Sequence, residues 1–370
     1  MASTATCTVT RSDSQPTEFI LPDFFSDCRY PMRLNPHCDS VSRATDQWLC
    51  SEARLVEPDV TKYTTILRPG YFASSCYPDA DAFHIKVCAD FHGWSDVNDA
   101  WGVRDCCMSA FRDPVNFQTE RYSGKLCESF FSRFKETASP GCTERFIHAM
   151  DLWFIAAAKE VENRAKGHIN DVESYIELRR DLSSCKACFA VVEFVCQIDL
   201  PEEVVSHPVI MALEEATNDF VSWSNDIYSY NMEQSYHSTH DLIAVLMVKQ
   251  GLDLQGAVDH YAQLCNIFLR RFEENPAILP SWGEEVDKDV AKYVEGLQNW
   301  IVGPLQWSFE SARYFGKDAH IVKQNRIVKL VPKDHLLACL ARPEWKEESC
   351  FYIELYTHEY VHMYQFLYKS

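Results

Sequence analysis

The chain has 370 residues, enough for one large or two ordinary domains, and it is 46% hydrophobic and 13% aromatic. Its net charge of −19 argues against nucleic acid or anionic membranes as partners, since both need a basic surface. Only 12 glycines, together with long apolar runs that lack strand alternation, predict an all-α protein.

The first residues predict neither a targeting peptide nor a membrane anchor. Residues 1–17 are polar, and we expect a flexible N-terminal tail without the apolar core of a signal peptide. No apolar run reaches 18 residues, so no membrane span is expected. The 16 cysteines are scattered through helical patterns and are interpreted as buried thiols of a reducing compartment, the cytoplasm.

An acidic stretch lies in the first helical part of the chain. Residues 18–45 have loop character, and the pattern is helical from about residue 46. Between Asp90 and Asp105, the carboxylates of Asp96 and Asp99 stand at i, i+3 on one helix face. Such a pair can hold Mg²⁺ or can form an ordinary solvated face.

Two helical segments follow. An apolar stripe predicts a helix over residues 146–165, and residues 172–198, without Pro or Gly, predict one long helix with a break near Ser183-Ser184. The second segment carries Arg179-Arg180, which is either a solvated pair or a fork of donors for phosphate oxygens.

The same segment contains Cys185-Lys186-Ala187-Cys188, which has the spacing of a redox or zinc half-site. There is no βαβ context and no matching second pair, so we interpret both cysteines as core thiols.

The helix predicted over residues 209–234 carries the most informative pattern. Asn225, Ser229 and Glu233 stand at i, i+4 and i+8, which stacks an amide oxygen, a hydroxyl and a carboxylate on one face. These are ligands for Mg²⁺ rather than zinc, and Mg²⁺ completes its shell with water and substrate phosphates. The pattern indicates an enzyme that handles a diphosphate.

A second set on this helix has the same spacing. Asn218, Ser222 and Asp226 lie nearly two turns earlier and point in roughly the same direction. Spacing alone does not choose between the two sets, nor between a metal site and a solvated polar face.

The remaining pattern is also helical. Residues 240–250 and 254–274 predict helices separated by Gly251, a Pro- and Gly-containing loop follows, and residues 285–315 predict a further helix. This last helix would end with Arg313-Tyr314, ahead of Gly316.

His358-Glu359-Tyr360-Val361-His362 matches the zinc-protease pattern H-E-x-x-H. Only eight residues follow, which leaves no room for a third ligand downstream, and an apolar stripe runs through the segment. A packed amphipathic helix explains this pattern better than a metal site.

Taken together, the motifs resemble those of class I terpene synthases, specifically the sesquiterpene synthases of basidiomycete fungi, over most of the chain. The resemblance rests on an ordered set of segments: Leu21-Pro22-Asp23, Tyr30-Pro31-Met32-Arg33-Leu34-Asn35-Pro36, Trp48, Leu178-Arg179-Arg180-Asp181, Cys188-Phe189, the run from Asn225 to Ser235, and Arg313-Tyr314-Phe315-Gly316. Arg179 stands 46 positions before Asn225, where such synthases place a diphosphate-sensing arginine, and this spacing selects Asn225 over Asn218.

The resemblance implies an α-helical bundle around a deep apolar cavity, formed by residues 18–316, with residues 317–370 as a helical extension. It implies three Mg²⁺ ions that bind the substrate diphosphate. The expected metal ligands are Asp96, Asp99, Asn225, Ser229 and Glu233. The expected catalytic and diphosphate-binding residues are Arg179, Arg313 and Tyr314.

The resemblance further implies a lyase that ionises a prenyl diphosphate, farnesyl diphosphate before geranyl diphosphate, and cyclises the carbocation. Aromatic faces would stabilise that cation. Candidates are Phe91, Trp94, Phe189, Trp223 and Trp307.

Two positions depart from the family pattern. No register of Trp94-Ser95-Asp96-Val97-Asn98-Asp99 reproduces Asp-(Asp/Glu)-x-x-Asp, and Met232 stands where a basic residue is common. An alternative is therefore a degenerate member that binds a prenyl diphosphate or a partner without turnover. A chain-elongating prenyltransferase would need a second aspartate-rich motif in place of the Asn-Ser-Glu face. The sequence leaves open the product and the oligomeric state, a homodimer included.

Overall fold

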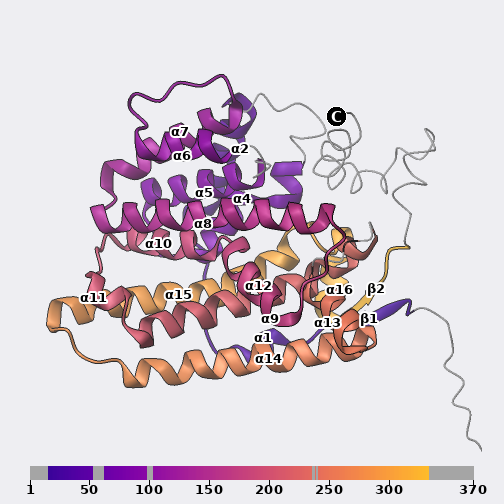
Figure 1. Cartoon of the computed structure of the whole chain (residues 1–370). Coiled ribbons are helices and arrows are strands. Elements are labelled where there is room, and N and C mark those ends of the chain that lie inside the picture. The colour runs from indigo at the N-terminus through magenta and orange to yellow at the C-terminus, as the bar shows by residue number, and fades with distance from the viewer. Residues whose placement is uncertain (1–15, 53–61, 98–102, 236–237, 239–240, 333–370) are drawn as a thin grey trace, which may run out of the picture.

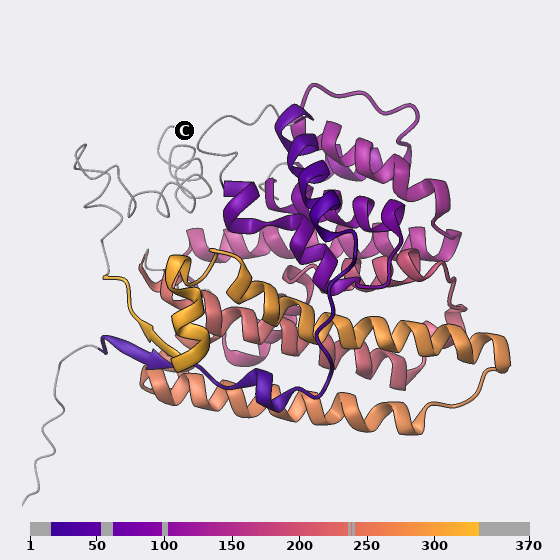
Figure 2. The same cartoon turned by 180° about the vertical axis from the view of Figure 1, so that it is seen from behind.

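The computed structural model describes residues 16–52, 62–97, 103–235, 238 and 241–332, and shows a helical bundle (Figures 1 and 2). The elements of its first half are β1 (Glu18–Ile20), α1 (Phe24–Asp27), α2 (Cys38–Glu52), the π-helix η1 (Lys62–Leu67), α4 (Pro69–Cys76), α5 (Ala82–Val97), α6 (Arg104–Arg112), α7 (Tyr122–Thr137) and α8 (Pro140–Ala165). Those of its second half are α9 (Val172–Leu182), α10 (Cys185–Cys196), α11 (Glu202–Val205), α12 (Pro208–Ser235), α13 (Leu242–Gln250), α14 (Leu254–Glu274), η2 (Asn275–Ile278), α15 (Glu284–Glu310), η3 (Gly316–Asp318), α16 (Ala319–Asn325) and β2 (Ile327–Lys329). The prediction of an all-α protein is confirmed.

The long helices are stacked. In Figure 1, α8 crosses the middle of the molecule, with α5, α6 and α7 above it and α15, α12 and α14 below. Helix α10 packs on α8 and on α15, and α12 packs against both α14 and α15. One continuous apolar core runs through these layers and includes the fully buried rings of Trp94, Phe130 and Phe146.

The predicted break at Ser183-Ser184 is confirmed and has a local cause. Helix α9 ends at Leu182, and Ser184 adopts a left-handed conformation with φ 60° before α10 begins. The Ser183 hydroxyl accepts a hydrogen bond from the Cys185 backbone N–H at 3.1 Å, which stabilises the first turn of α10. The break separates two helices that both contact α12.

Helix α8 begins at Pro140, six residues before the predicted start, and two further boundaries differ from the prediction for identifiable reasons. Helix α2 begins at Cys38, inside the region expected to be loop, because Val41, Thr45 and Leu49 give it a buried face. Helix α15 ends at Glu310 rather than at residue 315. There Arg68 donates a hydrogen bond to the Glu310 carbonyl at 2.6 Å, and Ser311 is extended, so the chain leaves the helix before Arg313.

The described part of the C-terminal extension packs on the bundle. Strand β2 pairs antiparallel with β1 near the N-terminus, and the backbone of Val331 bonds to the side chains of Asn231 and Gln234 on α12, at 2.8 and 2.7 Å. Residues 1–15 and 333–370, including the H-E-x-x-H segment, lie outside the described residues, so the predicted boundaries of the tail and the extension stay predictions.

The candidate half-site Cys185/Cys188 lies at the start of α10. Both side chains are buried, 2% exposed, and both are free thiols. They are core thiols, as predicted.

Candidate active site

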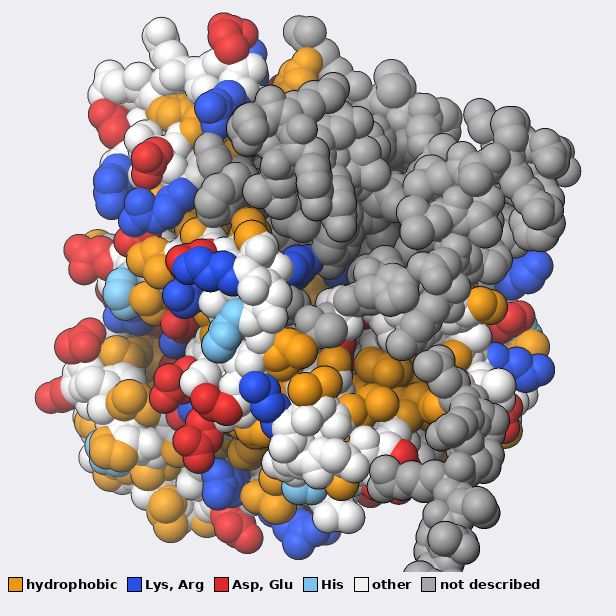
Figure 3. Space-filling model, turned by 45° about the vertical axis from the view of Figure 1, so that its right-hand side comes forward, with side chains coloured by type: hydrophobic (Ala, Val, Ile, Leu, Met, Phe, Trp, Pro, Cys, Tyr) orange, Lys and Arg blue, Asp and Glu red, His pale blue; other side chains and the backbone are white. Residues whose placement is uncertain are grey.

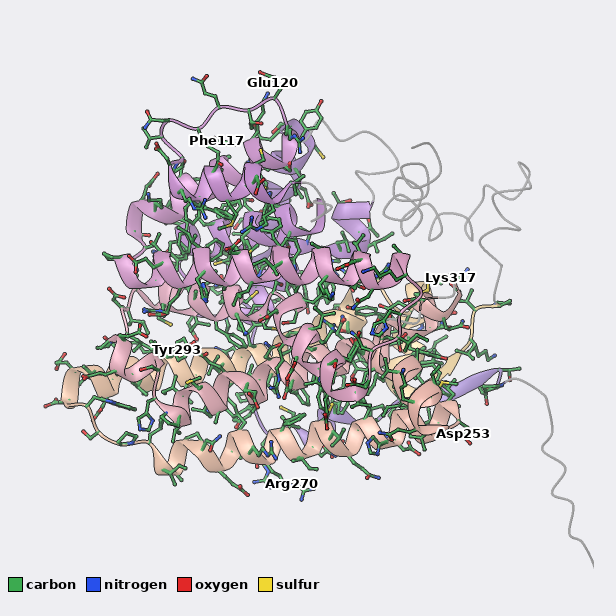
Figure 4. All side chains as sticks on the ribbon, viewed as in Figure 1. Phe117, Glu120, Asp253, Arg270, Tyr293 and Lys317 are labelled. Carbon is green, nitrogen blue, oxygen red and sulfur yellow. The ribbon has the colours of Figure 1, made fainter. Side chains whose placement is uncertain are left out.

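The predicted site residues that can be placed gather at one end of the bundle. The C-terminal half of α12, the last turn of α9 and the turn after α15 meet there, near α13 and α16 in Figure 1 and Lys317 in Figure 4. The N-terminus of α13 closes this end, because the Leu242 backbone N–H donates to the Asp226 carboxylate at 3.3 Å.

Asn225, Ser229 and Glu233 follow one another along α12. Ser229 is buried, 6% exposed, while Asn225 and Glu233 are partly buried. The Ser229 hydroxyl makes a long 3.5 Å bond to the Asp226 carbonyl and also bonds to the side chain of Glu233. This face therefore offers three oxygen donors in a partly enclosed position.

Arg179 is fixed against this face by a buried network. Its Nε donates to Asp226 Oδ1 at 2.9 Å, and its Nη2 donates to Asn225 Oδ1 at 2.9 Å. The hydroxyl of Tyr175, one turn earlier on α9, donates to Asp226 Oδ2 at 2.7 Å. Burial alone would lower the pKa of Arg179, but the negative charge of Asp226 outweighs it and the pKa is raised, so the guanidinium stays charged.

Asp226 and Tyr175 were not among the predicted site residues. Asp226 belongs to the alternative set on α12, and only its contact with α9 shows that it holds the arginine. The spacing of Tyr175 and Arg179 at i, i+4 was the available signal.

The rest of the alternative set is engaged in packing. Asn218 Oδ1 accepts hydrogen bonds from the hydroxyls of Ser183, at 2.8 Å, and Ser222, at 3.0 Å. Its Nδ2 donates to the Arg180 carbonyl at 2.8 Å. Asn218 and Ser222 thus join the α9–α10 break to α12.

Arg180 points elsewhere than Arg179. It makes two hydrogen bonds to Asp219, at 2.7 and 2.6 Å, and an ion pair with Glu215 at 3.0 Å. Asp219 is fully buried. Of the two neighbouring arginines, only Arg179 contacts Asn225 among the described residues.

The Arg313–Tyr314 pair reaches the same face from the turn after α15. The Asn225 side-chain amide donates to the Tyr314 hydroxyl at 2.5 Å, and Tyr314 is 2% exposed. The Arg313 guanidinium lies 5.6 Å from the ring centres of Trp307 and Tyr314. Asn225 is therefore contacted from α9 and from this turn at once.

The donor set suits a hard divalent cation. Burial raises the pKa of Glu233 to about 7, and the nearby charge of Asp226 adds to this. Burial and the charge of Glu233 likewise raise the pKa of Asp241, which caps α13 and is 1% exposed. Buried carboxylates that repel one another are stabilised as anions by a bound cation.

This donor set contains one acidic residue, Glu233, beside an amide and a hydroxyl. Accordingly, no group of three or more His, Cys, Asp or Glu side chains is arranged for a metal ion within the described residues.

The predicted first metal-binding wall cannot be compared with this site. Asp96 lies on the last turn of α5, but its side chain and the whole of Asp99 are outside the described residues. Their role as ligands stays a prediction.

The aromatic candidates have different surroundings. Trp307 contacts Tyr314 at 5.8 Å and so borders the site. Trp223 stacks on Tyr261 of α14 at 4.9 Å, and Trp94 packs among core rings, with its indole N–H bonded to the Ser123 carbonyl at 3.0 Å. Only Trp307 of these three contacts a predicted diphosphate-binding residue.

The fold matches solved terpene synthases. The chain superposes on α-eudesmol synthase with a TM-score of 0.69 at 19% identity, covering 77% of this chain and 98% of that one. Wild-type cucumene synthase gives a TM-score of 0.61 at 18% identity, covering 76% and 98%. The helical bundle is that of the class I terpene synthases.

Sequence comparison defines the family more closely. Residues 89–271 match the family described as terpene synthase family 2, C-terminal metal binding. Sesquiterpene synthase Agr1 of Cyclocybe aegerita is 42% identical over 91% of this chain and 100% of its own length. Alpha-muurolene synthase of Coprinopsis cinerea is 41% identical over 86% and 79%. The chain belongs to the fungal sesquiterpene synthases of the terpene synthase family, and this prediction is confirmed.

Charged side chains of both signs are mixed on the described surface (Figure 3). On the face shown in Figure 3, Lys and Arg side chains are interspersed with Asp and Glu side chains, without a broad basic area among its described residues. Among the described helices, none has both the length and the apolar composition needed to cross a bilayer.

Proposed function

We propose that this enzyme binds farnesyl diphosphate with three Mg²⁺ ions, ionises it and cyclises the carbocation to a sesquiterpene, releasing diphosphate. The observation that carries the proposal is the junction at Asn225. Its amide oxygen accepts from Arg179 and its amide nitrogen donates to Tyr314, so one predicted metal ligand lies between two predicted diphosphate contacts.

Arg179 is the residue best placed to respond to the substrate. When a diphosphate enters, Arg179 exchanges its bond to the Asn225 amide oxygen for a phosphate oxygen. Asp226 and Tyr175 keep the guanidinium oriented during the exchange. The exchange frees the Asn225 oxygen for a metal ion, so diphosphate and metal would bind together.

Asn225, Ser229 and Glu233 would hold one Mg²⁺, and Asp96 and Asp99 the others. Bound Mg²⁺ neutralises the diphosphate charge and makes it a better leaving group. Arg179, Arg313 and the Tyr314 hydroxyl would donate hydrogen bonds to the phosphate oxygens as negative charge develops on them.

The hydrocarbon part of the substrate would lie against apolar and aromatic side chains beyond Tyr314. Trp307 is the first of these, since it contacts both Tyr314 and Arg313. Cation–π attraction there is worth about 0.5–2 kcal/mol per ring. We further propose a cytoplasmic location, because the described cysteines are free thiols.

Incubation of the purified protein with farnesyl diphosphate and Mg²⁺, followed by gas chromatography of the volatiles, tests the function. We expect one or more sesquiterpenes with stoichiometric release of diphosphate. Geranyl diphosphate serves as the second substrate. Diphosphate binding without any hydrocarbon product from either would favour the non-catalytic alternative instead.

A further inference from the structure

His92 lies in an aromatic enclosure that the function proposed above does not use. It stands on α5 and is 5% exposed. The ring centres of its neighbours lie at 4.8 Å (Phe72), 5.0 Å (Phe91), 5.9 Å (Trp300) and 6.1 Å (Tyr77). Phe72 lies on α4, Phe91 on α5 and Trp300 on α15, and Tyr77 directly follows α4. Helix α4 packs on both α5 and α15.

The imidazole has an unpartnered nitrogen. Among the described residues, His92 Nε2 has no hydrogen-bond partner although it is buried. His84, two turns earlier on the same helix and 4% exposed, is the opposite case, because its nitrogens meet Asp81 Oδ1 at 2.8 Å and Thr137 Oγ1 at 3.2 Å. An unpaired buried polar atom reduces stability, so a purely structural role would be served better by an apolar ring.

A row of ring contacts connects His92 with the diphosphate end of the site. His92 contacts Phe72 at 4.8 Å, Phe72 contacts Trp307 at 4.8 Å, and Trp307 contacts Tyr314 at 5.8 Å. Phe72 is only partly buried although it lies against the buried rings of Trp300 and Trp307, so part of it faces open space. A hydrocarbon chain whose diphosphate lies at Tyr314 would run along this row toward His92.

Burial lowers the pKa of His92 to about 3, so its imidazole is neutral near pH 7. In the tautomer with the proton on Nδ1, Nε2 carries an unshared electron pair to which no described residue donates a hydrogen bond. Although its lowered pKa makes His92 a weak base, it can still accept a proton from a carbocation, since an alkyl carbocation is a far stronger acid than any imidazolium.

Resting on the proposed function, we infer that His92 is a catalytic base that accepts the proton whose loss ends the carbocation sequence. A C–H bond next to the cationic carbon breaks, and its electron pair forms the C=C bond of the product. The proton bonds to Nε2, and the resulting imidazolium passes it to the released diphosphate before the next turnover.

Replacement of the ring separates its basicity from its shape. In His92→Ala we expect diphosphate release close to the wild-type rate, while the share of the wild-type olefin falls at least roughly tenfold. Added imidazole should fill the vacated space and restore that olefin. Pyrrole, a ring of the same size without a basic nitrogen, should not. His92→Gln, closer in size, gives the same readouts if the alanine variant does not fold.

The matched control is His84→Gln, which removes a hydrogen-bonded histidine from the same helix and should leave the product distribution unchanged. An unchanged distribution in the His92 variants, or equal restoration by both rings or by neither, would overturn the inference. The absence of any hydrocarbon from the wild-type protein would instead contradict the proposed function itself, so the two failures are distinguishable.

Discussion

Arg179 and Arg180 are neighbours in the chain but meet different carboxylates. Arg179 reaches Asp226 and Asn225, whereas Arg180 reaches Asp219, two turns earlier on α12. The family resemblance predicted that Arg179 belongs with Asn225, because the two residues are separated by the 46 positions typical of such synthases. The sequence could not predict that Asp226 and Tyr175 hold Arg179 in place. The two polar sets on α12, one beginning at Asn218 and one at Asn225, have the same spacing, and only the packing of α9 distinguishes them.

The two aspartates offer a matched pair of variants. Asp226→Asn leaves Arg179 without its buried counterion, so we expect diphosphate release to fall roughly ten- to a hundredfold through loss of orientation. Asp219→Asn breaks the pair at Arg180, whose aspartate is also buried although its arginine is more exposed than Arg179, and we expect a loss of stability of up to about 3–5 kcal/mol without that loss of rate per folded molecule. Turnover and thermal unfolding of both variants provide the measurement. Equal losses of turnover would mean that the Arg179 network is only structural.

Glu214 gives the protein a pH-dependent stability. Burial raises its pKa from 4.5 to about 7, although the Tyr293 hydroxyl, on the residue labelled in Figure 4, donates to it at 2.6 Å. The folded state therefore holds this proton more tightly than the unfolded chain, and the associated stability is lost as pH rises from about 4.5 through 7.

Glu214→Gln keeps an acceptor for Tyr293 but does not titrate. Relative to the wild type, we expect this variant to gain about 1–3 kcal/mol of unfolding free energy between pH 5 and pH 8. Urea unfolding at both pH values measures the difference. A constant difference would contradict the raised pKa. Arg270, exposed on α14 (Figure 4), provides a surface variant, Arg270→Gln, for which no such change is expected.

At the scale of elements, helix existence was more predictable than helix ends. Residues 254–274 and the break at 183–184 were predicted as found, because Gly251, Asp253 and the paired serines are local stop and start signals. The end of α15 was missed because its terminal carbonyl is bonded by Arg68, a residue 242 positions away. Such a contact leaves no local pattern in the sequence.

The approach of α15 to α4 depends on Gly303. A Cβ at this position would lie 2.6 Å from the Ser75 carbonyl oxygen, so Gly303→Ala must push the two helices apart. We expect a loss of about 1–3 kcal/mol in unfolding free energy. A changed product distribution should accompany it, because Phe72 and Trp307 lie on these helices.

Gly93→Ala is the matched control, since its Cβ would meet only the end of the Leu49 side chain, at 3.0 Å, which can move. The loss of unfolding free energy in Gly93→Ala should be smaller, because the higher helix propensity of alanine, about 1 kcal/mol, offsets the contact with Leu49. Calorimetry of both variants measures the difference, and an equal or smaller loss in Gly303→Ala would show that the close backbone contact does not limit the packing.

At the scale of the whole molecule, the all-helical class and the family followed from composition and ordered motifs. The resemblance also implied that Arg179, Arg313 and Tyr314 act beside Asn225. The hydrogen bonds that join Arg179 and Tyr314 to Asn225, across 46 and 89 residues, follow from how the helices pack and leave no local pattern in the sequence. The acidic chain also has to bind an anionic substrate, which bound metal makes possible.

Metal and diphosphate should therefore stabilise the fold together. With Mg²⁺ in excess and inorganic diphosphate near 100 times the dissociation constant that it has in the presence of Mg²⁺, we expect about 2.7 kcal/mol of added unfolding free energy, and little from either ligand alone. Thermal unfolding with and without EDTA measures this. Equal stabilisation by diphosphate in the presence of EDTA would contradict a shared site.

The most direct test of the account locates the metal itself. Crystals grown with Mn²⁺ in place of Mg²⁺ and with inorganic diphosphate should show an anomalous-scattering peak bounded by Asn225, Ser229 and Glu233, with Arg179 on a phosphate oxygen. A peak beside Asn218 and Ser222 instead, or diphosphate bound with no metal on α12, would contradict the claim that this helix face holds the catalytic magnesium.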